Sequence, residues 1–475
     1  MASHFRFIGV VLTCSIVTFH ADAEDGVRQL RTTTSRDDNV RAPAPAAGDW
    51  RDDWRRNRNL IIESDPALTY DPTSVMVKFT PGTSDGQRAF IRAAIAGVTV
   101  ETWDSLPGLE HLAIPGRVED AIAAVSILGE MTQVVEFIEP DFVAHLNALT
   151  NDTSLGNLWA MNNTGQVVNS DAGTAGADID ADLAWDVVTG SSSMVVGMAD
   201  SGFNSTHEDL AANRWTNPGE IATNGIDDDG NGKIDDVWGW DFYNNDNNPT
   251  DDNGHGTHTA GTVGAVGNNG KGVVGVCWNV RLAGLKIGSR NGSILLSAGI
   301  SAVDYCIAKG IKVSNHSWGG GSFSSSFDAV VTRARTAGHM LVCSAGNNGA
   351  NSETAPLYPA SYAQNNIIAV AATDNNDALA SFSNYGSTRV DIAAPGVTIL
   401  STYIKTNSNK AYAYLSGTSM AAPYVTGAAA LVWSQNPSWT YAEVRNKLLS
   451  TVRPIPALSG KCVTGGVLNV NNAVR

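Results

Sequence analysis

From about residue 150 onward, short apolar runs alternate with segments in which apolar residues recur at helical spacing. The clearest helical segments are residues 297–309 and 420–435. Strands that alternate with helices in this way predict a mostly parallel sheet with helices on both faces. We therefore expect an α/β domain over residues 148–475, with strands at residues 194–199, 280–287, 312–315, 340–345 and 367–371.

A second, shorter pattern precedes this domain, in residues 60–147. Apolar runs bounded by turn residues alternate with two segments of helical spacing. The resulting β-α-β-β-α-β order is that of a small ferredoxin-like α+β domain. The expected elements are a strand at residues 75–79, a helix at 87–96, strands at 99–103 and 111–114, a helix at 118–128 and a strand at 134–140.

The first 23 residues are typical of a secretory signal peptide. His4 and Arg6 precede an apolar run at residues 7–19, and Ala21-Asp22-Ala23 follows as a small-x-small cleavage pattern. The run is shorter than the roughly 20 residues that a membrane span needs, so we expect export without a membrane anchor. Residues 24–59 are polar and rich in Arg, Asp, Ala and Pro, which predicts a disordered linker.

Composition narrows the class of protein. Of the 475 residues, 43% are hydrophobic and 16% are charged, which excludes a wholly disordered chain. The net charge of −16 leaves no basic excess for nucleic acid, so we expect no nucleic-acid partner. Besides Cys14, four cysteines remain, and an exported chain can join them in disulfides or bury them as free thiols. They are Cys277, Cys306, Cys343 and Cys462.

Three polar islands interrupt the apolar pattern. Asp200 ends the predicted strand at residues 194–199, His255 lies among small residues, and Ser419 stands where a helix begins. A serine hydroxyl needs a base to become a nucleophile, and the base needs an orienting carboxylate. The helix N-terminus at Ser419 also favours a developing oxyanion. The three residues therefore predict a nucleophilic triad in the chain order Asp, His, Ser.

These islands resemble the three active-site motifs of the subtilisin-like serine proteases, the subtilase family. The matching motifs are Asp200-Ser201-Gly202, His255-Gly256-Thr257-His258 and Gly417-Thr418-Ser419-Met420-Ala421-Ala422-Pro423, and the resemblance covers about residues 150–475. It implies a serine endopeptidase that acts on proteins or peptides as a monomer. It also implies that the Asn347 side chain, in Ala345-Gly346-Asn347, and the Ser419 N–H hold the oxyanion.

The same resemblance, more weakly, assigns residues 60–147 to an inhibitory propeptide. Such a segment assists folding and is then cut off, here between about residues 144 and 152. The chain as a whole is therefore expected to be a secreted, self-processing zymogen.

The resemblance also implies a substrate-binding cleft. Ser317, Trp318 and Gly319 would form one wall of the S1 cleft, and Ser344, Ala345 and Gly346 the other. Leu357 would lie at its base and Asn348 at its rim. Because none of these side chains is a carboxylate, we expect apolar or aromatic P1 residues rather than Lys or Arg.

Acidic loops predict structural Ca²⁺. Residues 227–236 place oxygen-bearing side chains at positions 1, 3 and 5 and Gly at position 6, as in an EF-hand loop, but the twelfth position is Trp238. A hydrated acidic turn is the alternative. The resemblance implies a second site at Asp209 and the loop at residues 266–271. The expected ligands are Asp209, Asp227, Asp229, Asn231, Asp235, Asp236 and Asn269.

Two other functions remain as alternatives. One is a catalytically inactive relative that binds peptides. The other is a non-enzymatic effector, since Arg28-Gln29-Leu30-Arg31 resembles the Arg-x-Leu-Arg motif of effectors from plant-infecting microbes. Export would also expose glycosylation sequons, of which Asn315 follows a predicted buried strand and is expected to stay unmodified. The others are Asn151, Asn162, Asn204 and Asn291.

Overall fold

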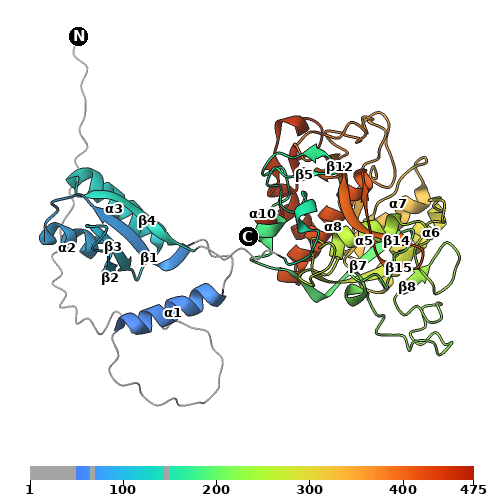
Figure 1. Ribbon diagram of the computed structural model, residues 1–475, viewed down its shortest axis with the longest axis horizontal. Helices are drawn as coiled ribbons and strands as arrows, with labels where there is room; N and C mark the ends of the chain where they lie inside the picture. The colour runs from blue at the N-terminus through green and yellow to red at the C-terminus, as the bar shows by residue number, and fades with distance from the viewer. Residues whose placement is uncertain (1–49, 65–69, 144–149) are drawn as a thin grey trace, which may run out of the picture. The chain divides into compact units, whose positions relative to one another are not determined.

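The computed structural model describes residues 50–64, 70–143 and 150–475 (Figure 1). The chain divides into two compact units, Met1–Ala144 and His145–Arg475, which are described separately. The predicted signal peptide, most of the predicted linker, the motif at residues 28–31 and Cys14 lie outside the described residues. Among the described residues, no helix combines the length and apolar character needed to cross a bilayer.

Helix α1 (Trp50–Ser64) corrects the expectation that residues up to 59 are disordered. Its polar residues support a helix because they pair at helical spacing. Arg56 lies 3.4 Å from Asp53 one turn earlier, and the Arg58 guanidinium lies 5.1 Å from the centre of the Trp54 ring. Such i,i+3 and i,i+4 pairs stabilise exposed helices, which a composition argument alone does not register.

The rest of the N-terminal unit has the predicted α+β order. Its antiparallel sheet has the strand order β2-β3-β1-β4. Helices α2 and α3 cover one face, where Val75, Val77, Ile91, Leu112 and Val125 are fully buried. The elements are β1 (Tyr70–Phe79), α2 (Asp85–Ala94), β2 (Val98–Thr102), β3 (Leu109–Ala113), α3 (Val118–Thr132) and β4 (Val135–Phe142).

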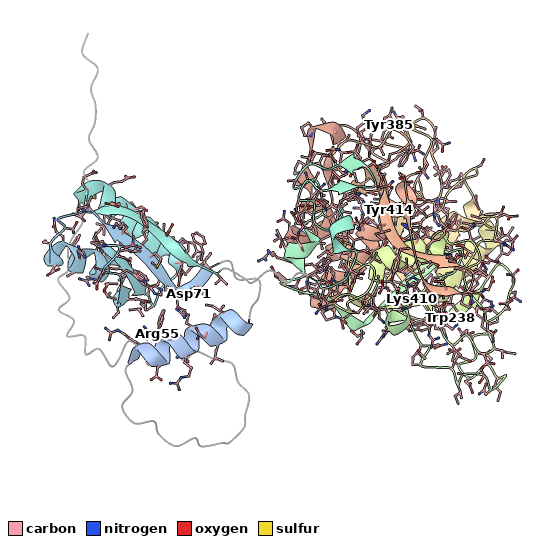
Figure 2. The ribbon with its side chains drawn as sticks, in the orientation of Figure 1. Arg55, Asp71, Trp238, Tyr385, Lys410 and Tyr414 are labelled. Carbon is pink, nitrogen blue, oxygen red and sulfur yellow. The ribbon has the colours of Figure 1, made fainter. Side chains whose placement is uncertain are left out.

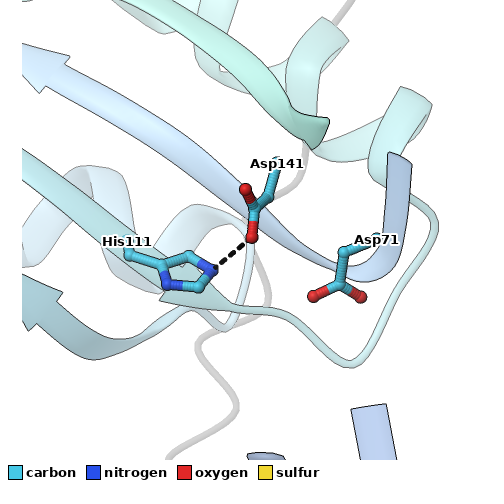
Figure 3. A group of neighbouring side chains, drawn as sticks. All are labelled: Asp71, His111 and Asp141. Atoms are coloured by element: carbon cyan, nitrogen blue, oxygen red, sulfur yellow. Dashed lines mark ion pairs between the residues drawn. The ribbon is translucent and has the colours of Figure 1, made fainter. Parts of the chain in front are cut away.

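The opposite face of this sheet carries polar side chains. His111 alternates along β3 with Leu112, so it points away from the apolar core. It lies beside Asp141 of β4, and Asp71 of β1 completes the group (Figure 3). Trp54 of α1 contacts the His111 ring edge-on at 5.5 Å, so α1 packs against this face.

The C-terminal unit is built on a nine-stranded sheet with the order β16-β17-β13-β12-β11-β10-β7-β9-β8. Neighbouring strands are parallel except for the edge pair β16–β17, which confirms the predicted mostly parallel sheet. Its strands are β7 (Gly190–Asp200), β8 (Gly239–Asp241), β9 (Asn279–Lys286), β10 (Val313–His316), β11 (Met340–Ser344), β12 (Ile367–Thr373), β13 (Ile392–Pro395), β16 (Arg453–Pro454) and β17 (Gly466–Val467).

Helices cover both faces of this sheet. Helix α8 (Thr418–Gln435) is buried around nearly its whole circumference and packs on strands β7 and β10–β13 and on α5 (His255–Gly264). Helices α6 (Leu296–Ala308) and α7 (Ser325–Thr336) pack together on the other side. The remaining elements are β5 (Val167–Val168), β6 (Asp171–Ala172), α4 (Ala181–Ala184), β14 (Ile399–Lys405), β15 (Ser408–Leu415), α9 (Tyr441–Ser450), α10 (Val470–Val474) and the 3-10 turns Leu155–Asn157, Ala211–Asn213 and Pro456–Leu458. Figure 2 labels Lys410 and Tyr414 on the β14–β15 hairpin.

The four described cysteines are free thiols, each buried in the C-terminal unit. Of the two alternatives that the sequence left open, the structure therefore shows buried thiols. Burial raises the pKa of Cys277 to about 12 and also raises those of Cys306 and Cys343. These thiols accordingly act as small apolar core residues.

Candidate active site

Asp200 is the last residue of β7 and lies at the carboxyl edge of the sheet. Its Oδ1 accepts hydrogen bonds from the Ser201 N–H at 2.8 Å and from His255 Nδ1 at 2.7 Å. Its Oδ2 accepts from Thr259 Oγ1 at 3.2 Å. The carboxylate is buried, so these bonds replace the water that it has lost and fix its orientation.

His255 is the first residue of α5, and the start of this helix lies against the loop after β7. A Cβ at Gly256 would stand 2.0 Å from the Gly202 carbonyl oxygen, so only glycine permits this approach. Burial alone lowers the pKa of His255, but the charge of Asp200, the hydrogen bond to it and the charge of Asp251 outweigh burial. The pKa therefore lies above the ordinary value of 6.5.

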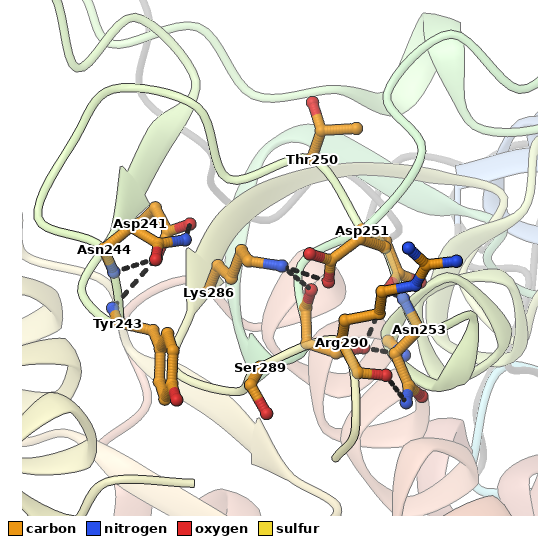
Figure 4. A network of polar contacts seen from close by, with 12 residues as sticks. Asp241, Tyr243, Asn244, Thr250, Asp251, Asn253, Lys286, Ser289 and Arg290 are labelled. Atoms are coloured by element: carbon orange, nitrogen blue, oxygen red, sulfur yellow. Dashed lines mark hydrogen bonds and ion pairs between the residues drawn. The ribbon is translucent and has the colours of Figure 1, made fainter. Parts of the chain in front are cut away.

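A buried polar network holds the loop that carries His255 (Figure 4). Asp251 accepts hydrogen bonds from Ser201 Oγ at 2.8 Å and from Thr257 N and Oγ1 at 2.9 and 2.6 Å. Lys286, at the end of β9, donates to the Ser201 carbonyl at 3.1 Å and pairs with Asp252. Asp251 and Lys286 were not predicted, because only the fold brings them to the sheet edge.

Ser419 lies in the first turn of α8 and lines the same cavity as Asp200, His255 and Asn347. This cavity has a volume of about 650 Å³. Ser419 Oγ donates to the Ser317 carbonyl at 3.0 Å, and Ser317 Oγ donates to the Ser419 carbonyl at 2.7 Å. The described contacts include no hydrogen bond between Ser419 and His255, and such bonds are often long or absent before substrate binds.

Asn347 is held by Thr418, a residue that the sequence analysis did not single out. Asn347 Oδ1 accepts from both the N–H and the Oγ1 of Thr418, each at 2.8 Å. Thr418 Oγ1 in turn accepts from the Gly346 N–H at 3.0 Å. Because the Oδ1 atom is fully engaged, the Nδ2 amide of Asn347 remains as the donor toward the cavity.

Of the predicted walls of the S1 cleft, Ser317, Trp318, Gly319, Ser344 and Gly346 line this cavity, together with Leu357 and Asn348. Ala345 is buried and does not line it. A Cβ added at Gly319 would lie 2.7 Å from Leu357 Cδ2, and one added at Gly346 would lie 2.6 Å from the same atom. Leu357 therefore reaches between the two walls. Further lining residues that sequence reasoning missed are Ile294, Leu296, Phe327, Tyr358 and Tyr362.

The acidic loop before β8 brings together only part of the predicted calcium ligands. Asp229 and Asp236 form a group with Glu220, which was not predicted. Asn231 joins it by donating from Nδ2 to Asp236 at 2.9 Å. The buried oxygens Glu220 Oε2 and Asn231 Oδ1 have no hydrogen-bond partner, so this cluster offers two unused ligand atoms.

Two predicted ligands have a different role. Asp227 accepts from the Asn231 and Gly232 N–H groups at 3.0 and 2.7 Å. Asp235 accepts from two main-chain N–H groups, of Asn224 and Gly225, at 3.1 Å each. Both carboxylates therefore satisfy the main chain of the loop and stand outside the group of Glu220, Asp229 and Asp236.

The second predicted pair does meet. Asn269 Nδ2 donates to Asp209 Oδ1 at 3.0 Å, and Asp209 Oδ2 accepts from the Val273 N–H and from Tyr412 Oη. Asp152 accepts from the Asn269 N–H at 3.1 Å, so a second carboxylate reaches the same loop.

The fold and the cavity define a class: an α/β protein with an acid, an imidazole and a serine at one edge of a parallel sheet. The family model described as the subtilase family matches residues 191–473, so the chain belongs to this family and is a serine-type endopeptidase. A thermophilic serine proteinase of Bacillus sp. (strain AK1) is 34% identical over 406 residues, covering 85% of this chain and 88% of that protein.

Two further relatives agree with this assignment. Thermitase of Thermoactinomyces vulgaris is 41% identical over 297 residues, which cover 62% of this chain and 94% of thermitase. Among solved structures, a protease from Pseudoalteromonas arctica PAMC 21717 superposes with a TM-score of 0.54 at 31% identity, over 68% of this chain and 98% of that one.

Proposed function

We propose that Ser419, His255 and Asp200 are the catalytic triad of this endopeptidase and that Asn347 is an oxyanion donor. The observation that carries the proposal is the 2.7 Å bond between Asp200 Oδ1 and His255 Nδ1, in a cavity that Ser419 and Asn347 also line. An Asp–His pair beside a serine at a helix N-terminus supplies the nucleophile, the base and the orienting carboxylate.

In this mechanism the Ser419 hydroxyl turns from the Ser317 carbonyl toward His255 Nε2. His255 takes its proton as Oγ attacks the peptide carbonyl carbon, and it later returns the proton to the leaving amine. Asp200 keeps the Nδ1 proton in place and stabilises the imidazolium. The tetrahedral oxyanion is held by Asn347 Nδ2 and the Ser419 N–H.

The cleft favours an apolar P1 side chain, because none of its lining residues near Leu357 carries a charge. An aromatic P1 side chain requires a change in the cleft. Leu357 lies between Gly319 and Gly346, so a large ring enters only if the Leu357 side chain moves aside.

The N-terminal unit is proposed to be the inhibitory propeptide, which self-processing removes between about residues 144 and 152. Support comes from its ferredoxin-like order of elements and its separation as a compact unit. Export through the predicted signal peptide completes the scheme of a secreted zymogen that works as a monomer. Asn315, one of the five sequons, is fully buried and bonded to Ser317, so it is not a glycan acceptor.

Ca²⁺ is proposed as a structural ion. Glu220 Oε2 and Asn231 Oδ1 are buried, unpaired oxygens of the kind that suits Ca²⁺. Asp229 and Asp236 are paired with Lys309, so an ion bound by all four residues would displace the Lys309 ammonium group. Asp209 and Asn269 are the candidates for a second site. The ion would stabilise these loops, and no step of the reaction passes through it.

The proposal is tested by expressing residues 24–475 beside the same chain with Ser419→Ala. We expect the wild type to shorten by the mass of the N-terminal unit and to take up a fluorophosphonate label, and the variant to do neither. A folded wild type that neither shortens nor labels in the presence of Ca²⁺ contradicts the proposal. An Asn347→Ala variant that folds and labels, but turns over about a hundred to a thousand times more slowly, supports the oxyanion role.

A further inference from the structure

An imidazole and two carboxylates meet on the face of the N-terminal sheet that α2 and α3 leave uncovered. Asp71 comes from β1, His111 from β3 and Asp141 from β4 (Figure 3). One ligand atom of each lies within 4.8 Å of the other two. Neither the proposed triad nor the calcium loops involve these residues, so their convergence needs a separate explanation.

His111 has an unsatisfied nitrogen inside this group. The residue is 5% exposed, and its Nε2 atom has no hydrogen-bond partner although it points at Asp141. A buried polar atom without a partner is rare, because its desolvation is not compensated. Burial is also the first cause that lowers the pKa of His111. A neutral imidazole is the form that ligates a metal.

The distance between the His111 and Asp141 ligand atoms suits a small divalent ion. Ligands about 2.1 Å from a tetrahedral zinc ion lie about 3.4 Å from one another. His111 Nε2 and Asp141 Oδ2 are 3.4 Å apart, which is too long for a good hydrogen bond and equal to this edge. Asp71 is held in place by hydrogen bonds from Thr73 N, Thr73 Oγ1 and Ser74 Oγ at 2.8, 2.7 and 2.6 Å. Such outer contacts orient a ligating carboxylate.

The charges around His111 also favour a cation. The negative charges of Asp141, Asp71 and Glu101 raise the pKa of His111, and the positive charge of Arg58 in α1 lowers it. A divalent ion would offset the charge of these carboxylates. The Trp54 ring lies edge-on to His111 and shields the group, so the attraction is stronger than at an open surface.

We propose that the N-terminal unit binds one divalent transition-metal ion of the zinc type through Asp71, His111 and Asp141. The mixed nitrogen and oxygen ligand set suits Zn²⁺ better than Ca²⁺, which takes oxygen ligands. The ion would tie Asp71, at the start of β1, to Asp141, near the end of β4 and three residues before this unit ends at Ala144. It would thereby stabilise the unit that is proposed to be removed on processing.

The test uses the full chain with Ser419→Ala, so that the N-terminal unit stays attached. Metal is first removed with chelator, and Zn²⁺ is then titrated calorimetrically in excess Ca²⁺, which fills oxygen-only sites. We expect one Zn²⁺ per chain, and at least tenfold weaker binding in His111→Gln and in Asp141→Asn. Glu136→Gln, which removes an exposed charge from the same strand, and Asp229→Asn, in the other acidic cluster, should bind Zn²⁺ like the parent.

Co²⁺ provides a second readout, because a tetrahedral site with a nitrogen ligand gives a visible absorption band that His111→Gln should abolish. Circular dichroism in metal-free buffer checks that each variant is folded. If His111→Gln does not fold, the partly exposed Asp141 supplies the variant that decides. The proposal is overturned if the parent binds no Zn²⁺, if Asp141→Asn binds it unchanged, or if only Asp229→Asn weakens it.

Discussion

Replacing Thr418 by valine tests whether this side chain positions Asn347, the proposed oxyanion donor. The change keeps the shape of the side chain and removes its hydroxyl group, which is fully buried. Asn347 Oδ1 then loses one of its two donors, the Thr418 hydroxyl at 2.8 Å, and keeps the Thr418 N–H at 2.8 Å. The Gly346 N–H loses its acceptor at 3.0 Å.

Two effects of different size follow from this geometry. Removing an oxyanion donor completely costs about a hundred- to a thousandfold in turnover. Because one of two bonds to Asn347 remains, we expect kcat to fall about tenfold, which corresponds to about 1.4 kcal/mol of transition-state stabilisation. The unpaired, buried Gly346 N–H should reduce the free energy of unfolding by about 1–3 kcal/mol.

Steady-state kinetics on a peptide substrate separates these effects from a change in substrate binding. We expect kcat to fall while KM stays within about twofold, because the oxyanion forms only in the transition state. The matched control is Thr418→Ser, which keeps the hydroxyl and should retain most of kcat. An unchanged kcat in the valine variant, or an equal loss in the serine variant, would show that the hydroxyl does not orient Asn347.

Three further predictions concern pH, specificity and calcium. The proposed mechanism requires the base form of His255, and its pKa is raised, so kcat/KM should increase with pH through an apparent pKa above 6.5, measured from pH 5 to 9. Leu357→Gly should raise kcat/KM for phenylalanine over alanine at P1 roughly tenfold in a peptide library; an unchanged ratio places Leu357 outside the S1 cleft. Chelator should lower the Tm of the Ser419→Ala chain, because Ca²⁺ at one hundred times its Kd stabilises the folded state by about 2.7 kcal/mol. Glu220→Gln should reduce the increase in Tm that adding Ca²⁺ restores. An equal Tm with and without Ca²⁺ refutes this prediction.

Local periodicity was sufficient for most of the secondary structure. The helix predicted at residues 420–435 is α8, Thr418–Gln435, and the strand predicted at residues 340–345 is β11, Met340–Ser344. Both are apolar over most of their length, so burial reinforces the local pattern. Helix α1 was missed for the opposite reason: its support comes from pairs of charged and aromatic side chains, which the composition of the segment conceals.

In the candidate site, too, some residues could be predicted from local sequence and others could not. Asp200, His255, Ser419 and Asn347 lie in short motifs, so sequence reasoning could name them, and the structure places them around one cavity. Residues that support them are separated from their partners by long stretches of chain. Lys286, for example, bonds the Ser201 carbonyl 85 residues earlier, a contact that only the packing of β9 beside β7 creates.

The acidic loop at residues 220–236 shows why spacing alone does not identify which carboxylates come together. The EF-hand spacing suggested Asp227 and Asp235, yet both carboxylates satisfy N–H groups where the main chain turns. Glu220 lies before the spaced residues and enters the group because the loop folds back on its own start. An unpaired oxygen on Glu220 is visible only once that fold is known.

The histidines of the C-terminal unit show how the partner of an imidazole sets the direction of its pKa shift. Burial lowers the pKa of His258 to about 4, of His316 to about 3 and of His339 to about 4, and their partners are carbonyl or hydroxyl groups. His255 is subject to the same desolvation, but its partner is the ionised Asp200, which reverses the direction of the shift. An imidazole that gains stability when protonated, beside a serine in an open cavity, can accept a proton during attack. The others remain neutral, so the carboxylate partner, rather than burial, distinguishes the proposed catalytic base from the other three histidines.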